Sequence, residues 1–381
     1  MKLVIHDLND EQWREIADRY QDSTVISDDG SIRPCVGCFG CWNKDPGRCV
    51  VKDGYENMGY LIHHADEVIV ISRYTYGGFS GFVKNVFDRC LGYVLPHFEL
   101  VNDRSHHKRR YDEDKPFTFI FYGHNLSEED KENAIRYVEA VCTNMRSHVK
   151  EVIFNEVEEK PEEKTIAPKN ISDRMIILNA SMRSANGNSA KLAIQLQKLL
   201  KGESEIINLS KYLNSNDELI SILSDVPRIV ICTPLYVDGL PSQLIRLMEN
   251  MENRYNGPAK KIYVLSNMGL YESEQLINLL SAVKKWCSRI GFEYAGALAV
   301  AAGELVGGFL EMSTLDKWPL KEINEGMKKL AEAINNNEII DDLYTGTYSF
   351  PRWLYMAIAN SGWRRMGKAN GLTNKDLFRQ L

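Results

Sequence analysis

The sequence lacks the features that would place it in a membrane, among disordered proteins or on nucleic acid. No hydrophobic run reaches the length of a transmembrane helix, and no low-complexity tract interrupts the 381 residues. Positive charge is not in excess, because the formal net charge is −6, whereas a nucleic-acid-binding protein usually has a basic surface. The first residues, MKLVIHDLNDEQWREI, contain no apolar core like that of a signal peptide. We therefore expect a cytoplasmic protein that binds no nucleic acid and has no membrane span.

An internal repeat indicates the fold class. DEVIVISRYTYGGFSGFVKNVFDR (residues 66–89) resembles PRIVICTPLYVDGLPSQLIRLMEN (residues 227–250), and each passes from a short apolar β-branched run through a glycine-containing loop into an amphipathic helix. Similar strand–loop–helix patterns precede and follow both stretches. Strands that alternate with helices predict parallel sheets covered by helices on both faces. We expect two doubly wound α/β domains, with a single long sheet as the alternative.

Composition shifts along the chain suggest the domain boundaries. We expect a first domain at residues 1–155, a charged, proline-containing linker at 156–172, a second domain at 173–311 and a helical C-terminal extension at 312–381. The end of this extension is aromatic and basic. A helix that docks on the protein and a helix that lies on a membrane surface would both have this composition, and we favour docking because the apolar stretch is short.

Four of the eight cysteines lie in CVGCFGCWNKDPGRC, residues 35–49. The first half of the repeat has extra residues between its first and central strands, and this segment lies among them, near the carboxyl end of a strand. Thiols stay reduced in the cytoplasm, so a metal or redox site is favoured over disulfides. An iron–sulfur cluster, a zinc site, redox-active thiols and a buried turn of small apolar thiols all remain open.

The loop after the first strand of the second domain is rich in hydroxyl and amide side chains. It leads directly into a helix, whose N-terminus offers unpaired N–H groups to a phosphate. The candidate phosphate-binding residues are Ser181, Arg183, Ser184, Asn186, Asn188 and Ser189. An ordinary capped helix is the alternative. At the matching place the first domain has Asp7, Asp10 and Glu11, which would repel a phosphate.

SMRSANGNSAKL, TPLYVDGLPSQLIRLME and SNMGLYE together resemble the flavodoxin-like NAD(P)H-dependent FMN reductases. The resemblance covers roughly residues 1–150 and 173–311, and it implies a five-stranded parallel sheet that binds FMN at the carboxyl ends of its strands. It assigns the loop above to the FMN phosphate. It assigns two further loops to the flavin ring, namely Pro234, Leu235, Tyr236, Val237, Asp238 and Gly239, and Ser266, Asn267, Met268 and Gly269.

The cysteine spacing is similar to that of the iron–sulfur flavoproteins, which carry a [4Fe–4S] cluster beside FMN. This resemblance implies Cys35, Cys38, Cys41 and Cys49 as cluster ligands. Many flavodoxin-like reductases have a similar segment without an established cluster.

These observations favour a flavin-dependent oxidoreductase that transfers electrons from NAD(P)H through FMN, and through an iron–sulfur cluster if one is present. The chain shows no Ser–His–Asp or paired-carboxylate constellation, which suits a reaction whose chemistry belongs to the cofactor, and no catalytic side chain is assigned. The acceptor is open among a quinone, a nitro or azo compound, a free flavin and a protein, and a homodimer is equally open. The alternatives are an FMN and iron–sulfur electron carrier without turnover, and a zinc-stabilised binding module.

Overall fold

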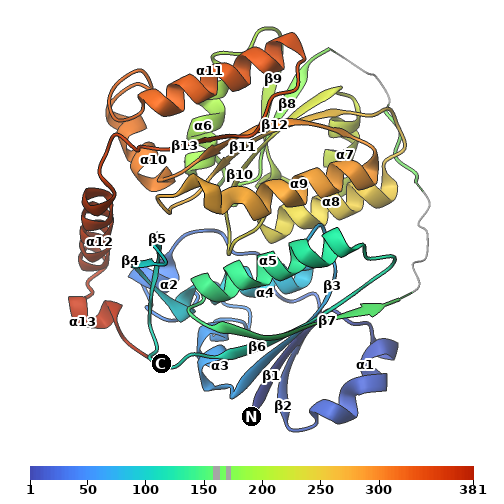
Figure 1. The fold of residues 1–381 in the computed structure, drawn as a ribbon, viewed down its shortest axis with the longest axis vertical. Coiled ribbons are helices and arrows are strands. Elements are labelled where there is room, and N and C mark those ends of the chain that lie inside the picture. The colour runs from blue at the N-terminus through green and yellow to red at the C-terminus, as the bar shows by residue number, and fades with distance from the viewer. Residues whose placement is uncertain (158–163, 169–172) are drawn as a thin grey trace. The chain divides into compact units, whose positions relative to one another are not determined.

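The computed structural model describes residues 1–157, 164–168 and 173–381, and the chain divides into two compact units (Figure 1). The first unit comprises Met1–Lys160 and Met356–Leu381, and the second comprises Pro161–Tyr355. Most of the linker predicted at 156–172 lies outside the described residues.

A five-stranded parallel sheet forms the centre of the first unit, in the order β2-β1-β3-β6-β7. Its strands are β1 (Lys2–His6), β2 (Ser23–Ser27), β3 (Glu67–Arg73), β6 (Pro116–Gly123) and β7 (His148–Glu156), and a separate antiparallel hairpin comprises β4 (Val94–Val101) and β5 (Arg104–Arg109). The helices are α1 (Asp10–Ile16), α2 (Gly40–Asn43), α3 (Met58–His64), α4 (Gly81–Arg89), α5 (Glu128–Asn144) and α13 (Asn374–Leu377), with 3-10 turns at Ala17–Tyr20 and Cys90–Tyr93. Counted along the chain, the sheet order is 2-1-3-4-5, which is the flavodoxin-like arrangement.

Alternation along the strands divides the core of this sheet into two faces. Phe117, Phe119 and Phe121 of β6 recur every second residue and are buried on one face, where Phe117 stacks on Phe119 and Phe79 stacks on both Phe119 and Phe121. On the other face, Ile69 and Ile71 of β3 form a cluster against which α1 packs. Helices therefore cover both faces, as in a doubly wound sheet.

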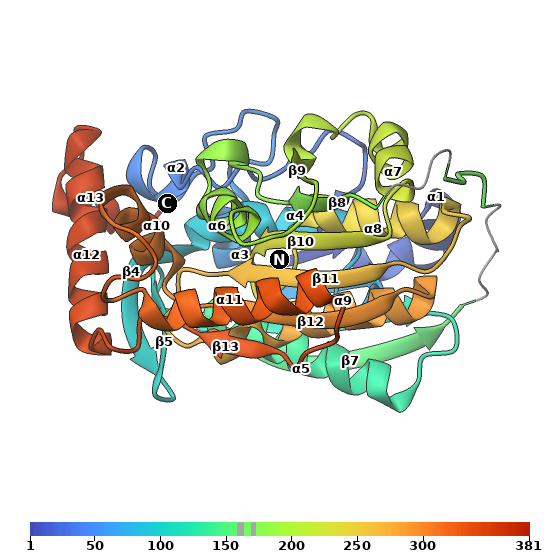
Figure 2. The ribbon, with the colours of Figure 1, turned by 90° about the horizontal axis from the view of Figure 1, so that it is seen from above.

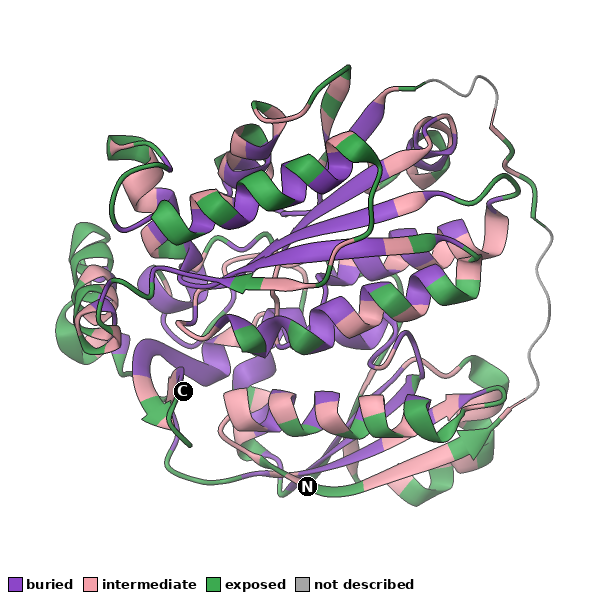
Figure 3. Cartoon of the chain, turned by 45° about the horizontal axis from the view of Figure 1, so that its top comes forward, coloured by how far each residue is buried: buried purple, intermediate pink, exposed green. Residues whose placement is uncertain are grey.

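The second unit contains a six-stranded parallel sheet in the order β13-β12-β11-β10-β8-β9 (Figure 2). Its strands are β8 (Met175–Asn179), β9 (Ser204–Asn208), β10 (Arg228–Pro234), β11 (Lys261–Asn267), β12 (Glu293–Val300) and β13 (Leu343–Thr345). Its helices are α6 (Asn188–Gln197), α7 (Asn216–Ser224), α8 (Ser242–Arg254), α9 (Ile277–Ile290), α10 (Gly303–Met312) and α11 (Lys321–Asn336), with 3-10 turns at Ser184–Asn186, Leu209–Lys211 and Ser273–Leu276. The central strands are buried along most of their length, whereas α11 exposes one face (Figure 3).

Counted along the chain, the second sheet has the order 2-1-3-4-5-6, so the flavodoxin-like arrangement recurs with one added strand. The predicted fold class, two flavodoxin-like doubly wound parallel-sheet domains with a helical C-terminal part, is confirmed. Residues 312–355, which we assigned to the extension, contribute α11 and β13 to the second unit. Helix α12 (Arg352–Ala369) begins in the second unit and continues in the first. Among the described residues, no helix is both long and apolar enough to cross a membrane.

Candidate cofactor site

Three of the predicted loops meet at the carboxyl edge of the second sheet. Strand β10 pairs with both β8 and β11, so the loops that follow these strands are neighbours. The Ser189 hydroxyl donates a hydrogen bond to Oδ1 of Asn267 at 2.6 Å, and the Leu235 N–H donates to the Asn267 carbonyl at 2.8 Å. Asn267 thus links the first turn of α6 to the residue that follows β10.

The N-terminus of α6 is left open by its cap. Gly187 occupies the cap position and offers no side chain to the first turn. The N–H groups of Asn188 and Ser189 have no acceptor among the residues that the structure describes. A side chain at Gly187 would collide with Ser181, because a Cβ there would lie 2.5 Å from the Ser181 hydroxyl. The sequence therefore keeps two amides and the positive end of the helix dipole available to an anion.

The corresponding helix of the first unit is closed. Oδ1 of Asn9 accepts hydrogen bonds from the N–H groups of Glu11 and Gln12 at 3.0 and 2.9 Å, and Gln12 completes a capping box. The Asp7 carboxylate accepts from the Arg73 N–H and from the Tyr122 hydroxyl at 3.1 and 3.0 Å. Burial raises the pKa of Asp7, while these hydrogen bonds oppose the shift. An internal carboxylate thus holds donors at this edge that an anionic ligand would otherwise use.

The second loop is a tight turn in which Tyr236 and Gly239 exchange backbone hydrogen bonds of 3.0 Å. Val237 and Asp238 both have positive φ, at 38° and 57°. The first unit repeats the turn between Thr75 and Gly78, with hydrogen bonds of 3.0 and 2.9 Å. The two halves therefore share a turn conformation that only the second half builds without a central glycine.

A buried hydroxyl without a partner in the described part of the chain lies at the end of β11, where the third predicted loop begins. Ser266 has no exposed surface, and its Oγ has no hydrogen-bond partner in the described part of the chain. A Cβ placed on Gly269 would meet no atom within 4 Å. A buried unsatisfied hydroxyl costs free energy, on the order of 1–3 kcal/mol, unless a ligand or water completes it. Open amides at α6, the Ser266 hydroxyl and free space at Gly269 fit a bound nucleotide-like cofactor such as FMN.

Sequence reasoning missed a wall of this site, helix α10. A Cβ on Gly303 would lie 2.9 Å from the Asn267 amide, and a Cβ on Gly307 would lie 1.9 Å from Oδ1 of Asn188. Only glycine at these two positions lets α10 approach both loops. Arg183 lies 3.5 Å from Glu304 of α10 in a partly exposed ion pair. Gly303 and Gly307, four residues apart in GELVGGF, are the sequence signal for this close approach of the helix.

The four clustered cysteines lie in the first unit and are all free thiols. Burial raises the pKa of the Cys41 thiol well above its usual value, and the charges of Cys35, Cys49 and Cys38 raise it further. The Arg89 Nε donates to the Cys49 sulfur at 3.1 Å. In residues 1–157, 164–168 and 173–381, however, no three or more Cys, His, Asp or Glu side chains are arranged to hold a metal ion.

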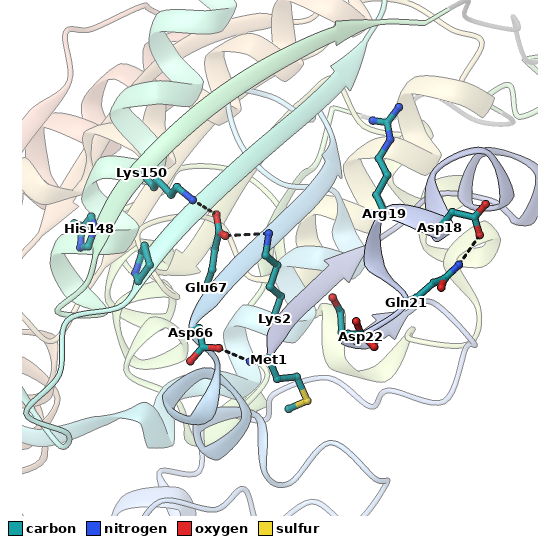
Figure 4. A pocket seen from close by; sticks show the side chains of 12 residues that line it. Met1, Lys2, Asp18, Arg19, Gln21, Asp22, Asp66, Glu67, His148 and Lys150 are labelled. Carbon is teal, nitrogen blue, oxygen red and sulfur yellow. Dashed lines mark hydrogen bonds and ion pairs between the residues drawn. The ribbon is translucent and has the colours of Figure 1, made fainter.

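A pocket in the first unit lies at the other edge of its sheet, where β1, β3 and β7 begin (Figure 4). Its charged groups mainly neutralise one another. The Glu67 carboxylate accepts from Lys150 at 2.8 Å and lies 3.3 Å from Lys2, and the N-terminal amino group pairs with Asp66. Ligand sites of open α/β sheets lie at the carboxyl ends of the strands, so we assign no function to this pocket.

No family model matches the chain, and no curated protein matches it in sequence. Among solved structures, it is similar to the Trp repressor binding protein from Bacillus subtilis, with 19% identity, a TM-score of 0.27, and coverage of 33% of this chain and 83% of that one. It is also similar to an azoreductase from Bacillus anthracis, with 15% identity, a TM-score of 0.30, and coverage of 43% and 100%. A flavone reductase matches with 13% identity, a TM-score of 0.32, and coverage of 48% and 70%.

Proposed function

We propose that the second unit binds FMN and that the protein is a flavin-dependent oxidoreductase using NAD(P)H. The observation that carries this proposal is the contrast between the two units. Helix α6 has an open N-terminus near a buried hydroxyl that lacks a partner, whereas α1 is capped by Asn9. The sequence resemblance to the FMN reductases assigns FMN to the same loops.

Each loop then has a separate task in holding the cofactor. The N–H groups of Asn188 and Ser189, with the hydroxyls of Ser181 and Ser184, bind the phosphate, and Arg183 supplies compensating charge. The remaining loops lie along the flavin ring. Their residues are Pro234, Leu235, Tyr236, Val237, Asp238, Gly239, Ser266, Asn267, Met268 and Gly269.

Bound FMN would supply the hydride and electron chemistry that connects NAD(P)H to an acceptor. The protein contributes position, a hydrogen bond from Ser266 and the exclusion of water by the packed loops. The acceptor class stays open among quinones, nitro or azo compounds, flavins and proteins.

For Cys35, Cys38, Cys41 and Cys49, a [4Fe–4S] cluster is supported by sequence resemblance alone. The described side chains do not form a metal site, and we derive no electron-transfer step through these thiols. Measurement of iron, acid-labile sulfide and zinc in protein purified without oxygen distinguishes a cluster, a zinc site and free thiols.

FMN titration of an isosteric variant tests the proposal. Asn188→Asp keeps the size of the side chain but adds a negative charge in the first turn of α6. We expect the Kd for FMN, followed by flavin fluorescence, to rise at least about tenfold, which corresponds to about 1.4 kcal/mol. Asn9→Asp, the same change at the capped helix of the first unit, is the control and leaves the Kd unchanged. Equal effects of the two variants, or no FMN binding by the unaltered protein, would refute the assignment.

Anaerobic addition of NADPH and then NADH separates an enzyme from a carrier without turnover. Loss of the flavin absorbance band within seconds supports the reductase. A flavin that stays oxidised with both nucleotides supports the electron carrier.

A further inference from the structure

The C-terminal tail (residues 356–381) packs on the cysteine segment (residues 33–49) inside the first unit. The Trp363 ring meets the rings of Phe39 and Trp42 edge-on, at centroid distances of 5.3 and 5.1 Å. Further along, Arg379 donates to Asp45 at 2.6 Å. The Leu381 side chain closes over Gly47, where a Cβ would lie 2.8 Å from it. The two segments therefore form one continuous surface.

A buried arginine fixes the end of the tail. Arg110 donates to the carbonyls of Leu377 and Arg379 at 3.1 and 2.7 Å, and Gln380 donates back to the Arg110 carbonyl at 2.8 Å. Nη1 of this buried guanidinium makes both bonds to the tail, and its Nε donates to the Gly92 carbonyl at 2.7 Å, so the tail is tied to the chain around Gly92 and Arg110. The backbone at the end of the tail is thus held in place before any partner arrives, which lowers the entropy cost of binding.

This surface is basic although the whole chain is acidic. The two segments carry seven exposed cations that form no ion pair with any acid among the described residues, namely Arg33, Lys44, Arg48, Arg364, Arg365, Lys368 and Lys375. The acidic residues of the two segments are Asp45, which accepts from Arg379, and Asp376, which accepts from Thr373. The two segments thus contain eight Lys and Arg residues against two Asp and no Glu, whereas the formal net charge of the whole chain is −6.

Large apolar side chains are exposed on the same two segments. Val36, Ile358, Met366 and Phe378 have exposed fractions of 40%, 45%, 39% and 42%. Exposed apolar residues within a charged surround are typical of protein docking surfaces, where apolar contacts supply affinity and charges supply orientation and rate.

We propose that this surface docks an acidic electron-carrier protein. The inference deepens the proposed function, because it selects a protein from the acceptor classes left open above. The seven cations attract a partner with a compact acidic patch. An extended polyanion, such as DNA or an anionic membrane, would also meet the acidic remainder of the chain, which opposes its binding. The partner would lie over the cysteine segment, where Cys38 is exposed.

Calorimetric titration with a plant-type [2Fe–2S] ferredoxin and with an acidic flavodoxin tests the proposal. Both probes are oxidised, and no FMN or NAD(P)H is added. We expect at least one probe to bind the full chain at about 20 mM NaCl, and to bind at least about tenfold more weakly at about 300 mM, because salt screens surface charge. Absence of binding by both probes at low salt would overturn the proposal.

Two charge-reversal variants and a matched control locate the surface. The triple variant Arg364→Glu, Arg365→Glu, Lys368→Glu is expected to weaken binding at least about tenfold, and the double variant Lys44→Glu, Arg48→Glu to weaken it in the same direction. The control reverses Lys321, Lys328 and Lys329, exposed cations on α11 of the second unit, and leaves the Kd unchanged. Equal losses in all three variants would show a general charge effect and refute the assignment.

Two other anionic ligands of this surface, a membrane and DNA, are tested in parallel. Vesicles containing about 30% phosphatidylserine, or a short DNA duplex, that bound more tightly than either protein probe would replace the proposed partner. FMN titration of the triple variant separates the two proposals. Intact FMN binding with lost docking supports the surface, whereas docking without any FMN binding leaves the surface in place and refutes the flavin assignment.

Discussion

Val237 has a backbone conformation that a β-branched residue rarely adopts, with φ at 38°. Such residues cost on the order of 1–3 kcal/mol, and they cluster at ligand-binding sites. Its place between Tyr236 and Gly239, in the loop assigned to the flavin, fits that tendency. The strained backbone at Val237 therefore supports the assignment of this loop to the flavin site.

Replacing this valine tests the strain. Val237→Gly removes the steric conflict, and we expect the free energy of unfolding to rise by about 1 kcal/mol after the greater chain entropy of glycine is counted. Urea denaturation measures the change. Val237→Ala, which keeps a Cβ at positive φ, should gain less. A loss of stability in the glycine variant would show that the turn is not strained.

His6 makes the first unit sensitive to acid. Its ring is buried, stacks on Trp13 at 4.1 Å, and has no hydrogen-bond partner among the described residues. Burial lowers the pKa of His6 from 6.5 to about 4. The folded form thus binds the proton less well than the unfolded chain. The stabilising contribution is full above pH 6.5 and is lost as the pH falls toward 4, by up to about 3 kcal/mol.

The variant His6→Phe keeps the stacked ring but cannot titrate. We expect the free energy of unfolding of the variant to fall less steeply between pH 6.5 and 4 than that of the unaltered protein. Denaturation at a series of pH values measures both slopes. Identical slopes would assign the acid sensitivity to other groups, such as His97, whose pKa burial also lowers to about 4.

Helix α10 shows what one element adds to the site. Two of its glycines approach Asn267 and Asn188, so its position and that of the loops depend on each other. Gly307→Ala would place a methyl group against the Asn188 side chain, and we expect FMN binding to weaken at least about tenfold as α10 or the loop shifts. The adjacent Gly308 has no atom within 4 Å of a built Cβ.

Gly308→Ala is therefore the matched control for this helix. We expect it to leave the Kd for FMN unchanged and to raise stability by up to about 1 kcal/mol, since alanine favours helix over glycine. Fluorescence titration and urea denaturation provide both readouts. Loss of FMN binding in both variants would mean that α10 responds to any side chain, and not to the contact with Asn188.

Local sequence patterns predicted many of the strands and helices. Features that depend on contacts between residues distant in sequence were not predicted. Apolar β-branched runs predicted β3 and β10, because buried parallel strands favour such residues. The Asn9 cap is a local contact with Glu11 and Gln12, whereas Asp7 accepts from Arg73, 66 residues further along the chain. A sequence pattern can indicate the first kind of contact but not the second. The strand β13 (Leu343–Thr345) and the wall formed by α10 (Gly303–Met312) depend on tertiary packing, and neither was predicted from the sequence.

In the whole molecule, the ends of the chain are tied to the same unit. Residues 356–381 belong with Met1–Lys160, and Trp363 is their buried anchor, with 6% of its surface exposed. We expect Trp363→Ala to lower the free energy of unfolding by about 3–5 kcal/mol and to speed alkylation of the cysteine segment by iodoacetamide. Trp353 lies on the same helix and is 71% exposed, so Trp353→Ala should change stability by less than about 0.5 kcal/mol. Unchanged alkylation in the Trp363 variant would contradict the anchoring role.

The two sheets share one strand order over five strands but have different edges. The first closes its edge with Asp7 and Asn9, and the second keeps amides and a hydroxyl open. A crystal structure of the protein with FMN measures this difference most directly. We predict that the phosphate lies against the N–H groups of Asn188 and Ser189. A phosphate bound near Asp7 and Asn9, with the turn from Ser181 to Ser189 free of ligand, would contradict the account.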